Sequence, residues 1–326
     1  MDVLGDVLAA MRAGRPYAGR TRCWEPWGVR FPAGDSACCH IVLQGACCLI
    51  PPEGAPIALD VGDVLFTAPG HGHVLADRPG SPLVDFRPSR DDRSLITELN
   101  IPGPGPATEM LCVCYSFDRI RPHPLLADLP PVIHLPARVG SHAALRATVD
   151  LIGDELRRPR VGTEAILAPL VDMLLMYVLR VWIDEQSGHA TTGWAAALTD
   201  TAVATALHHI HQRPEHPWTV EELATRSGVS RATFAKRFTT VVGQPPLAYL
   251  TWWRMTTAAQ LLRGTDALLP VVAERSGYSS EFAFAKAFKR EYGIPPGRYR
   301  RQPPSFTGTA GYASAGKPAP TSTGPS

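Results

Sequence analysis

The sequence has no lysine among its first 130 residues and no cysteine beyond Cys114. It also has no uncharged apolar run long enough to cross a bilayer, because the most apolar stretch, 166–183, contains Asp172 and Arg180. The N-terminus lacks the sustained apolar core of a secretory signal. These absences predict a cytoplasmic protein without a membrane span, in which the seven cysteines stay reduced.

Catalytic signatures are missing as well. The chain shows no pair of carboxylates spaced for acid–base work, no nucleophile elbow and no glycine-rich phosphate loop. We therefore predict that the protein is not an enzyme and that it needs no cofactor.

The net charge is small, but the charges are unevenly distributed. It is +2 over 326 residues, a length typical of two domains. Residues 1–130 contain 11 Arg against 15 acidic side chains, whereas residues 214–302 contain 13 Arg and Lys against 7 acidic ones. This asymmetry predicts that only the C-terminal part binds a polyanion such as nucleic acid.

The apolar pattern predicts an α+β multidomain fold. Short apolar runs separated by Gly, Pro and Asp are typical of a β-sandwich or small barrel, and a helical period follows from residue 141. The predicted strands are 37–43, 46–50, 57–59, 64–67 and 110–117, and the predicted helices are 141–158 with Ser141 as N-cap, 163–186 and 194–212.

The predicted helix 163–186 is apolar on most of its faces. Either it packs on the β-structure, or its second apolar face forms a homodimer. The expected organisation is a first domain over 1–136, a helical linker over 137–213, a basic helical domain over 214–302 and a tail over 303–326. The tail is rich in Pro, Gly, Ser and Thr and is expected to be disordered.

The basic domain contains an internal repeat. Seven identities recur at an offset of 50 residues within 16 positions, which is hard to ascribe to chance. The pairs are Phe234 and Phe284, Lys236 and Lys286, Phe238 and Phe288, Gly243 and Gly293, Pro245 and Pro295, Pro246 and Pro296, and Tyr249 and Tyr299. Just upstream the offset is 49 and aligns Gly228 with Gly277.

Each copy has the pattern of a helix-turn-helix unit. In the first copy, Thr219 is expected to cap a helix with Glu222 in the capping-box position, and Gly228 is expected to end it. Ser230 then caps a second helix, with Phe234 on its buried face. The corresponding residues of the second copy are Pro270 at the helix start, Gly277 at its end and Ser279 or Ser280 as the next cap.

The outward faces of the two second helices form the predicted DNA-binding surface. Joined by a helix over 247–263, they can read two groove segments about one turn (~34 Å) apart. Basic side chains suit phosphate contacts, which position the helices, whereas contacts to base edges determine which DNA sequence is bound. The predicted phosphate contacts are Arg231, Arg237, Lys289 and Arg290; Lys236 and Lys286 contact a base or a phosphate; the other predicted residues are Ala232, Ala235, Ser280, Glu281 and Phe282.

Residues 218–300 resemble the AraC/XylS family of bacterial transcription regulators, most closely over VVAERSGYSSEFAFAKAFKREYGIPPGRYR at 271–300. The resemblance implies two recognition helices in adjacent major-groove segments, usually with activation at a promoter. It places Ala232, Ala235 and Lys236, then Glu281, Phe282 and Lys286, toward the bases. Because three of these are small or apolar, thymine methyls or DNA shape are expected to contribute to readout.

The N-terminal region resembles the cupin-type sensor domain of one branch of that family. The matching segments are GDVLFTAPGHGHVL at 62–75, HIVLQG at 40–45 and HPLLADLPPVIHL at 123–135. Aligned with metal-binding cupins, the chain offers Cys38, His40 and His73, but Gln44 is a poor replacement for a glutamate ligand. A metal site is therefore one interpretation of this domain.

A sensor that responds to an effector is a second interpretation, and the effector can be of two kinds. Some regulators of this branch respond to oxidants through cysteines whose positions match Cys23 and Cys112, and Arg22 could lower the thiol pKa of Cys23. A small apolar ligand held inside the barrel is the second kind of effector.

The sequence therefore predicts a DNA-binding transcription regulator, expected to be an activator, whose cupin-like domain senses a small ligand or an oxidant. Its expected partners are double-stranded promoter DNA, RNA polymerase, the effector and a second copy of the chain. The competing hypotheses are a metal-binding cupin enzyme and a helical adaptor that does not bind DNA.

Overall fold

The structure, a computed structural model, describes residues 2–11, 16–34, 36–86, 88–89, 96–117, 122–137, 142–186, 191–301 and 311–312. The chain divides into two compact units. The β unit comprises Pro16–Tyr115, Pro131–Asp172 and Thr307–Ser326, and the helical unit comprises Met1–Arg15, Ser116–Pro130 and Met173–Phe306.

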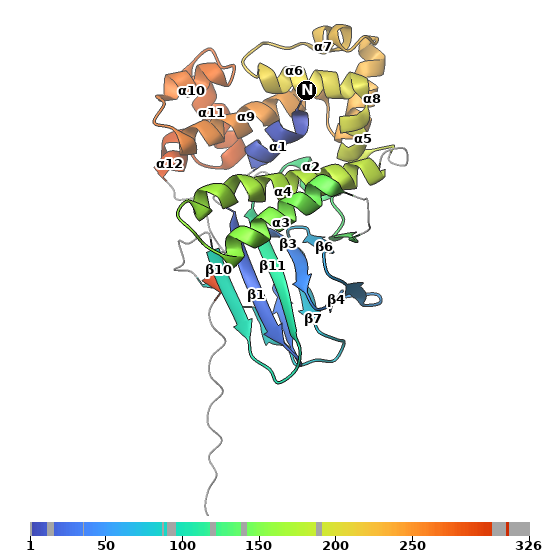
Figure 1. The fold of residues 1–326 in the computed structure, drawn as a ribbon. Helices are drawn as coiled ribbons and strands as arrows, with labels where there is room; N and C mark the ends of the chain where they lie inside the picture. The colour runs from blue at the N-terminus through green and yellow to red at the C-terminus, as the bar shows by residue number, and fades with distance from the viewer. Residues whose placement is uncertain are drawn as a thin grey trace, which may run out of the picture. The chain divides into compact units, whose positions relative to one another are not determined.

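The β unit is built on two β-sheets (Figure 1). The six-stranded sheet has the order β10 (Ile96–Ile101), β1 (Tyr17–Trp24), β11 (Ala107–Ser116), β3 (Ser36–Gln44), β6 (Val64–Thr67) and β12 (Val132–Leu135). The five-stranded sheet has the order β5 (Ile57–Leu59), β4 (Cys47–Ile50), β7 (His73–Ala76), β2 (Gly28–Phe31) and β8 (Val84–Asp85). The pairs β1–β10 and β2–β8 are parallel.

Apolar side chains from both sheets form one core. Leu49 and Leu75 of the smaller sheet are fully buried with Leu65, Met110 and Cys112 of the larger one. This arrangement confirms the predicted sandwich, with alternating side chains turned inward.

Several strands were not predicted, and β1 shows why. It contains Arg20 and Arg22, which break the apolar alternation. Both guanidinium groups bind the carboxylate of Glu109 on β11, at 2.5 Å and 3.2 Å between nitrogen and oxygen. A charged strand is thus accommodated by a partner 87 or more residues away, which a local pattern does not reveal.

Two helices follow the strands, α3 (Ala143–Arg157) and α4 (Thr163–Gln186). The bounds of α4 match the prediction. Among the described helices it alone is long and apolar enough to cross a membrane, and 56% of its most apolar window is buried within the structure. The predicted cap of α3 is wrong: His142, at a positive φ of 53°, occupies that position without a side-chain cap bond, and Ser141 lies outside the described residues.

Besides residues 173–186 of α4, the helical unit contains ten described helices (Figure 1). They are α1 (Val3–Met11), α2 (Pro124–Asp128), α5 (Gly193–Thr199), α6 (Thr201–Gln212), α7 (Val220–Arg226), α8 (Arg231–Val242), α9 (Pro246–Gly264), α10 (Leu269–Arg275), α11 (Glu281–Tyr292) and α12 (Pro296–Arg301). The first helix of the chain, α1, packs against α6 and α9. Its Ala9 carbonyl accepts a hydrogen bond from Gln260, and its Asp6 carboxylate lies 3.5 Å from His211 Nδ1.

The predicted single helix 194–212 is wrong, because two helices meet at Asp200. The Asp200 carboxylate accepts hydrogen bonds from the backbone N–H groups of Ala202 and Val203, at 3.0 Å and 3.1 Å. Aspartate is a favoured N-cap, so it starts α6 afresh.

The predicted limits at 136, 213 and 302 differ from the limits of the two units. Both α1 and Ser116–Pro130 belong to the helical unit. In the predicted tail, Gly311–Tyr312 forms a short strand, β13, antiparallel to β9 (Pro88–Ser89), and the rest of 303–326 lies outside the described residues.

Candidate nucleic-acid interface and buried thiol–imidazole cluster

The first helix-turn-helix unit consists of α7 and α8. Thr219 Oγ1 accepts a hydrogen bond from Glu222 N at 3.1 Å, and Ser230 Oγ accepts one from Thr233 N at 3.3 Å. Gly228 between the helices has a φ of +70°, which glycine adopts without strain. The predicted caps and turn are therefore confirmed.

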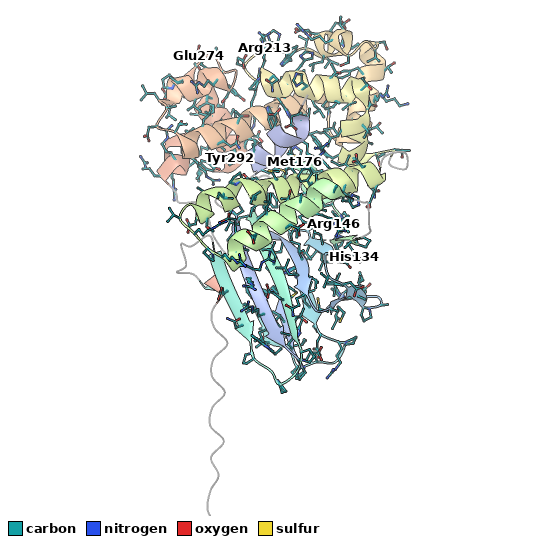
Figure 2. All side chains as sticks on the ribbon, in the orientation of Figure 1. His134, Arg146, Met176, Arg213, Glu274 and Tyr292 are labelled. Atoms are coloured by element: carbon teal, nitrogen blue, oxygen red, sulfur yellow. A yellow bond between two sulfur atoms is a disulfide. The ribbon has the colours of Figure 1, made fainter. Side chains whose placement is uncertain are left out.

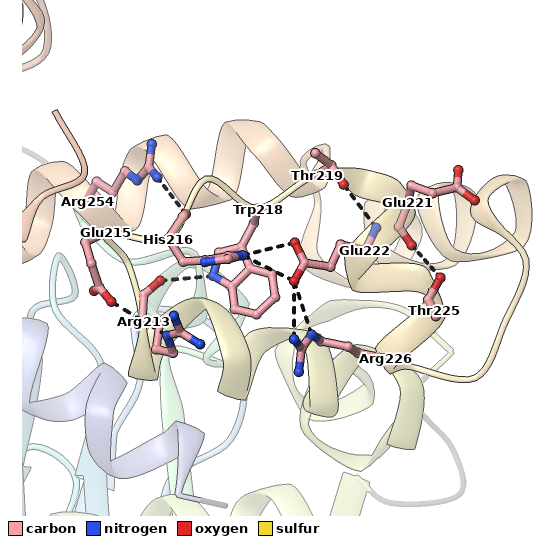
Figure 3. A network of polar contacts seen from close by, with 10 residues as sticks. All are labelled: Arg213, Glu215, His216, Trp218, Thr219, Glu221, Glu222, Thr225, Arg226 and Arg254. Atoms are coloured by element: carbon pink, nitrogen blue, oxygen red, sulfur yellow. Dashed lines mark hydrogen bonds and ion pairs between the residues drawn. The ribbon is translucent and has the colours of Figure 1, made fainter. Parts of the chain in front are cut away.

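The capping box of α7 is only half formed, however. The Glu222 carboxylate binds His216 at 3.0 Å and Arg226 at 3.3 Å, so it does not return to its own helix start (Figure 3). This network ties α7 to the segment that precedes it.

The second unit, α10 and α11, repeats this geometry. Ser280, and not Ser279, is the N-cap, and its hydroxyl accepts a hydrogen bond from Ala283 N at 3.2 Å. Phe284 and Phe288 are fully buried, as predicted. Tyr292, labelled in Figure 2, stacks on Phe288 with ring centroids 4.5 Å apart.

The outer faces of α8 and α11 present the predicted residues to solvent. Lys236, Lys286 and Lys289 are exposed, and no carboxylate among the described residues lies within ion-pair distance of them. Phe282 is 81% exposed, which is unusual for an aromatic side chain. Ala235 is half-buried.

The three predicted arginines already contact carboxylates. Arg237 binds Asp200, the residue that caps α6. Arg231 lies 4.0 Å from Glu221, and Arg290 lies 3.0 Å from Glu291. These exposed pairs are weak, so Arg231 and Arg290 remain available to a phosphate. Arg237 is more firmly held by its partly buried partner.

A second feature lies inside the β unit, where a thiol and two imidazoles meet. His40 Nδ1 is 3.1 Å from Cys112 Sγ, and His40 Nε2 is 2.9 Å from His73 Nε2. Phe31 stacks on the His73 ring with centroids 4.7 Å apart, and Thr21 Oγ1 lies 3.5 Å from the Cys112 sulfur. The chain of contacts joins β3 and β11 of one sheet to β7 of the other.

Burial keeps the two imidazoles of this cluster uncharged. It lowers the pKa of His40 well below its usual range, and His73 adds to the effect. Burial likewise lowers the pKa of His73 to about 4. Both imidazoles are therefore neutral at pH 7, and one can donate a hydrogen bond to the other.

The cysteines are arranged differently from the prediction. Cys38 forms a disulfide with Cys114, with 4.2 Å between their Cα atoms, so the expectation that all seven stay reduced is wrong. Arg22 contacts Glu109, and burial raises the pKa of Cys23, contrary to the expected lowering. The two strands that carry the disulfide are neighbours in the six-stranded sheet.

A sequence model of the cupin family matches residues 2–184, and one of the helix-turn-helix domain matches residues 223–302. An AraC-like transcription regulator of Streptomyces lividans is 35% identical over 308 residues, covering 93% of this chain and 99% of that protein. The chain belongs to the AraC-like family of transcription regulators. The HTH-type transcriptional regulator AlkR of Acinetobacter baylyi is 30% identical over 311 residues, covering 93% of this chain and all of that protein. Among solved structures, the DNA-binding domain of AdpA in complex with a target DNA is 33% identical and covers 31% of this chain and 91% of that one, with a TM-score of 0.29.

In this regulator the predicted metal site loses one of its candidate ligands. His40 and His73 come together, but the Cys38 sulfur is bonded to Cys114, and Gln44 is exposed at the end of β3. The described residues include no group of three His, Cys, Asp or Glu side chains arranged to hold an ion.

Sequence reasoning missed several polar residues of this regulator. Buried His211 lies with its Nε2 2.7 Å from the Tyr249 hydroxyl and stacks on Trp253 at 3.7 Å. On the edge strand β12, His134 (Figure 2) lies 2.9 Å from the Asp63 carboxylate. None of these has a sequence signal, since each pairs with a residue at least 38 positions away.

Proposed function

We propose that this regulator activates transcription by binding double-stranded promoter DNA, with α8 and α11 in two successive segments of the major groove. The supporting observation is that Lys236 and Lys286, which are equivalent in the repeat, are both exposed without a carboxylate partner among the described residues. An exposed, unpaired ammonium group at one position of both helices suits a polyanionic partner.

The residues of the two faces divide by chemistry. Arg231, Lys289 and Arg290 suit phosphates, and Arg237 suits a phosphate only at the cost of its contact with Asp200. Ser280 offers its hydroxyl at the start of α11, where a helix N-terminus favours phosphate. The base-facing residues proposed are Ala232, Ala235, Lys236, Glu281, Phe282 and Lys286.

The function is tested by selecting bound duplexes from genomic DNA with the purified full-length protein, before and after a mild oxidant. We expect a discrete motif of two half-sites whose centres are about one helical turn apart. A salt titration on random duplex then measures the non-specific affinity, which phosphate contacts make steeply salt-dependent. Absence of any motif together with a flat salt response would favour a helical adaptor.

We further propose that the β unit senses a small ligand or an oxidant. Cys112 is the better placed of the two predicted thiols, because His40 Nδ1 lies 3.1 Å from its sulfur, whereas burial raises the pKa of Cys23. Replacing Cys112 by serine is expected to abolish any response of DNA binding to oxidant. If DNA binding by Cys112→Ser still responds to oxidant and DNA binding by Cys38→Ser does not, the sensing group is the Cys38–Cys114 disulfide and not Cys112.

The remaining partners are also proposals. RNA polymerase is a proposed partner because an activator bound at a promoter acts on the polymerase. A homodimer is supported by Leu151 on α3 and Ile166 on α4, which are 54% and 45% exposed. Since its target is chromosomal DNA, we place the protein in the cytoplasm.

A further inference from the structure

Arg254 lies in the middle of α9, the helix between the two helix-turn-helix units, and contacts both of them. Its Nε donates a hydrogen bond to the Pro214 carbonyl at 2.6 Å. Its Nη2 donates one to the His216 carbonyl at 2.9 Å, which Figure 3 shows. Both carbonyls belong to the segment that leads into α7. The guanidinium group therefore holds the entry of the first unit.

The same guanidinium packs against the turn of the second unit. A Cβ atom on Gly277, which separates α10 from α11, would lie 2.7 Å from Cζ and from Nη2 of Arg254 and 2.8 Å from Nε. Gly277 has a φ of +74°, and the equivalent Gly228 of the first unit has a φ of +70°. A Cβ on Gly228 would meet nothing within 4 Å, so the close approach is peculiar to the second turn.

The segment held by Arg254 is itself ordered by hydrogen bonds. His216 N donates to the Arg213 carbonyl at 3.2 Å, and Trp218 N donates to the His216 carbonyl at 2.8 Å. Trp218 Nε1 also donates to the Arg213 carbonyl, at 3.0 Å (Figure 3). Arg254 is thus attached to a defined structure that begins at the end of α6 and continues into α7.

The chemistry of the guanidinium suits this position. Burial lowers the pKa of Arg254, which shows that the charge is partly removed from water. A partly buried cation is costly unless its N–H groups are satisfied, so the two bonds to carbonyls restrict the side chain to one geometry. The planar fork of arginine can bind two carbonyls along its edge while its face packs on a glycine, which lysine cannot do.

We propose that Arg254 is a positioning residue that sets the placement of the second helix-turn-helix unit relative to the first, and thereby the half-site spacing that the protein accepts. This inference rests on the proposed function. One added base pair moves a half-site by about 3.4 Å along the duplex and about 34° around it. A rigid link between the units should therefore discriminate against such a change, and a loosened link should tolerate it.

The test measures dissociation constants of the full-length protein for synthetic duplexes. Each duplex carries the two half-sites selected by the wild-type protein, with their separation changed by −2 to +2 base pairs, and a further duplex carries one half-site alone. For wild type we expect the preferred spacing to bind about tenfold tighter than its neighbours, a difference typical of one lost specific contact. For Arg254→Met we expect this ratio to fall below about threefold, with the single half-site bound within about twofold of wild type.

A pair of glycine variants provides the matched control. Gly277→Ala and Gly228→Ala impose similar backbone strain, but only the first displaces the Arg254 guanidinium. We expect Gly277→Ala to lose spacing discrimination as Arg254→Met does, and Gly228→Ala to retain it. Thermal unfolding identifies any variant that does not fold, and Arg254→Lys, which keeps the charge without the fork, is then measured in place of Arg254→Met.

The possible failures are distinguishable. If wild type binds none of the duplexes specifically, the proposed function fails and this inference fails with it. If wild type has one preferred spacing and the Arg254 variants retain it, the proposed function stands and the role of Arg254 is refuted. Equal spacing profiles for the two glycine variants would refute it as well.

Discussion

Lys236 and Lys286 are equivalent in the repeat, and their surroundings make them a matched pair for mutation. Each is exposed on the second helix of its unit. If these lysines contact bases, we expect Lys236→Ala and Lys286→Ala each to weaken specific DNA binding by about 1–3 kcal/mol. If they contact phosphates, we expect each variant to reduce the slope of log affinity against log salt concentration by about 1. Filter binding at several salt concentrations separates the two. Arg158→Ala, an exposed cation of the β unit, is the control, and unchanged affinity in both lysine variants would contradict the assignment.

Phe282 differs from its neighbours because it is a large apolar side chain in water. At 81% exposure, its replacement by alanine should leave the free energy of unfolding nearly unchanged. If it contacts a thymine methyl, Phe282→Ala should reduce the preference for thymine at one operator position by about fivefold or more. Selection from a randomised duplex pool measures this directly. The same base preferences in variant and wild type would exclude the contact.

At the scale of elements, the ion pairs between β1 and β11 should make stability depend on pH. Although burial favours the neutral acid, hydrogen bonds and charge from Arg20 and Arg22 lower the pKa of Glu109 below its ordinary value of 4.5. A carboxyl group with a lowered folded-state pKa stabilises the fold above its unfolded pKa, and that contribution is lost as the pH falls through the folded value. Stability should therefore decline below about pH 4.5.

The variant Glu109→Gln tests this link. At pH 7 it should lower the free energy of unfolding by about 2–3 kcal/mol, because Arg20 is left largely buried without its partner. The difference from wild type should shrink at pH 4, where the unfolded chain already binds the proton. Urea unfolding at both pH values gives the two differences, and a constant difference would show that the carboxylate charge is not the cause.

The elements also show which parts of the fold are readable from sequence. The caps Thr219, Ser230 and Ser280 and their turns were predictable, because each signal and its partner lie within four residues. Because the unit is repeated, the same kinds of cap and turn residue occur twice in the sequence. The parallel pairing of Ala18 with Ile96 in β1 and β10, by contrast, joins distant residues whose register no local pattern encodes.

The same reasoning explains why the disulfide was not predicted. Cys23 and Cys112 were chosen for their positions along the chain, whereas sulfur chemistry depends on which strands become neighbours. Cys38 meets Cys114 only because β3 and β11 are adjacent. His40 and His73, which the alignment with metal-binding cupins offers as ligands, do come together, with 2.9 Å between their Nε2 atoms, but a metal role for them stays a prediction.

For the whole molecule, the exposed apolar side chains raise the question of whether the protein is a monomer or a dimer. Leu151 and Ile166 are such side chains on the helices of the β unit. Replacing both by glutamate should convert a dimer into a monomer at micromolar concentration, because a charge at the centre of an apolar interface is costly to bury. Sedimentation equilibrium measures the mass. Val84→Glu is the control, since Val84 is 42% exposed on β8 of the five-stranded sheet, and a monomeric wild type would refute the dimer.

The packing of α1 has a consequence for how the chain is made. Its apolar face, with Val3, Val7, Leu8 and Met11 buried in the finished fold, is synthesised before the helices that it packs against. Its partner helix α6 begins about 190 residues later, which at ordinary synthesis rates is a delay of about 10–40 s. During that interval the helix has no native surface to cover it and is exposed to chaperones and to mispairing. The nascent regulator therefore completes the packing of α1 only after α6 and α9 have been translated.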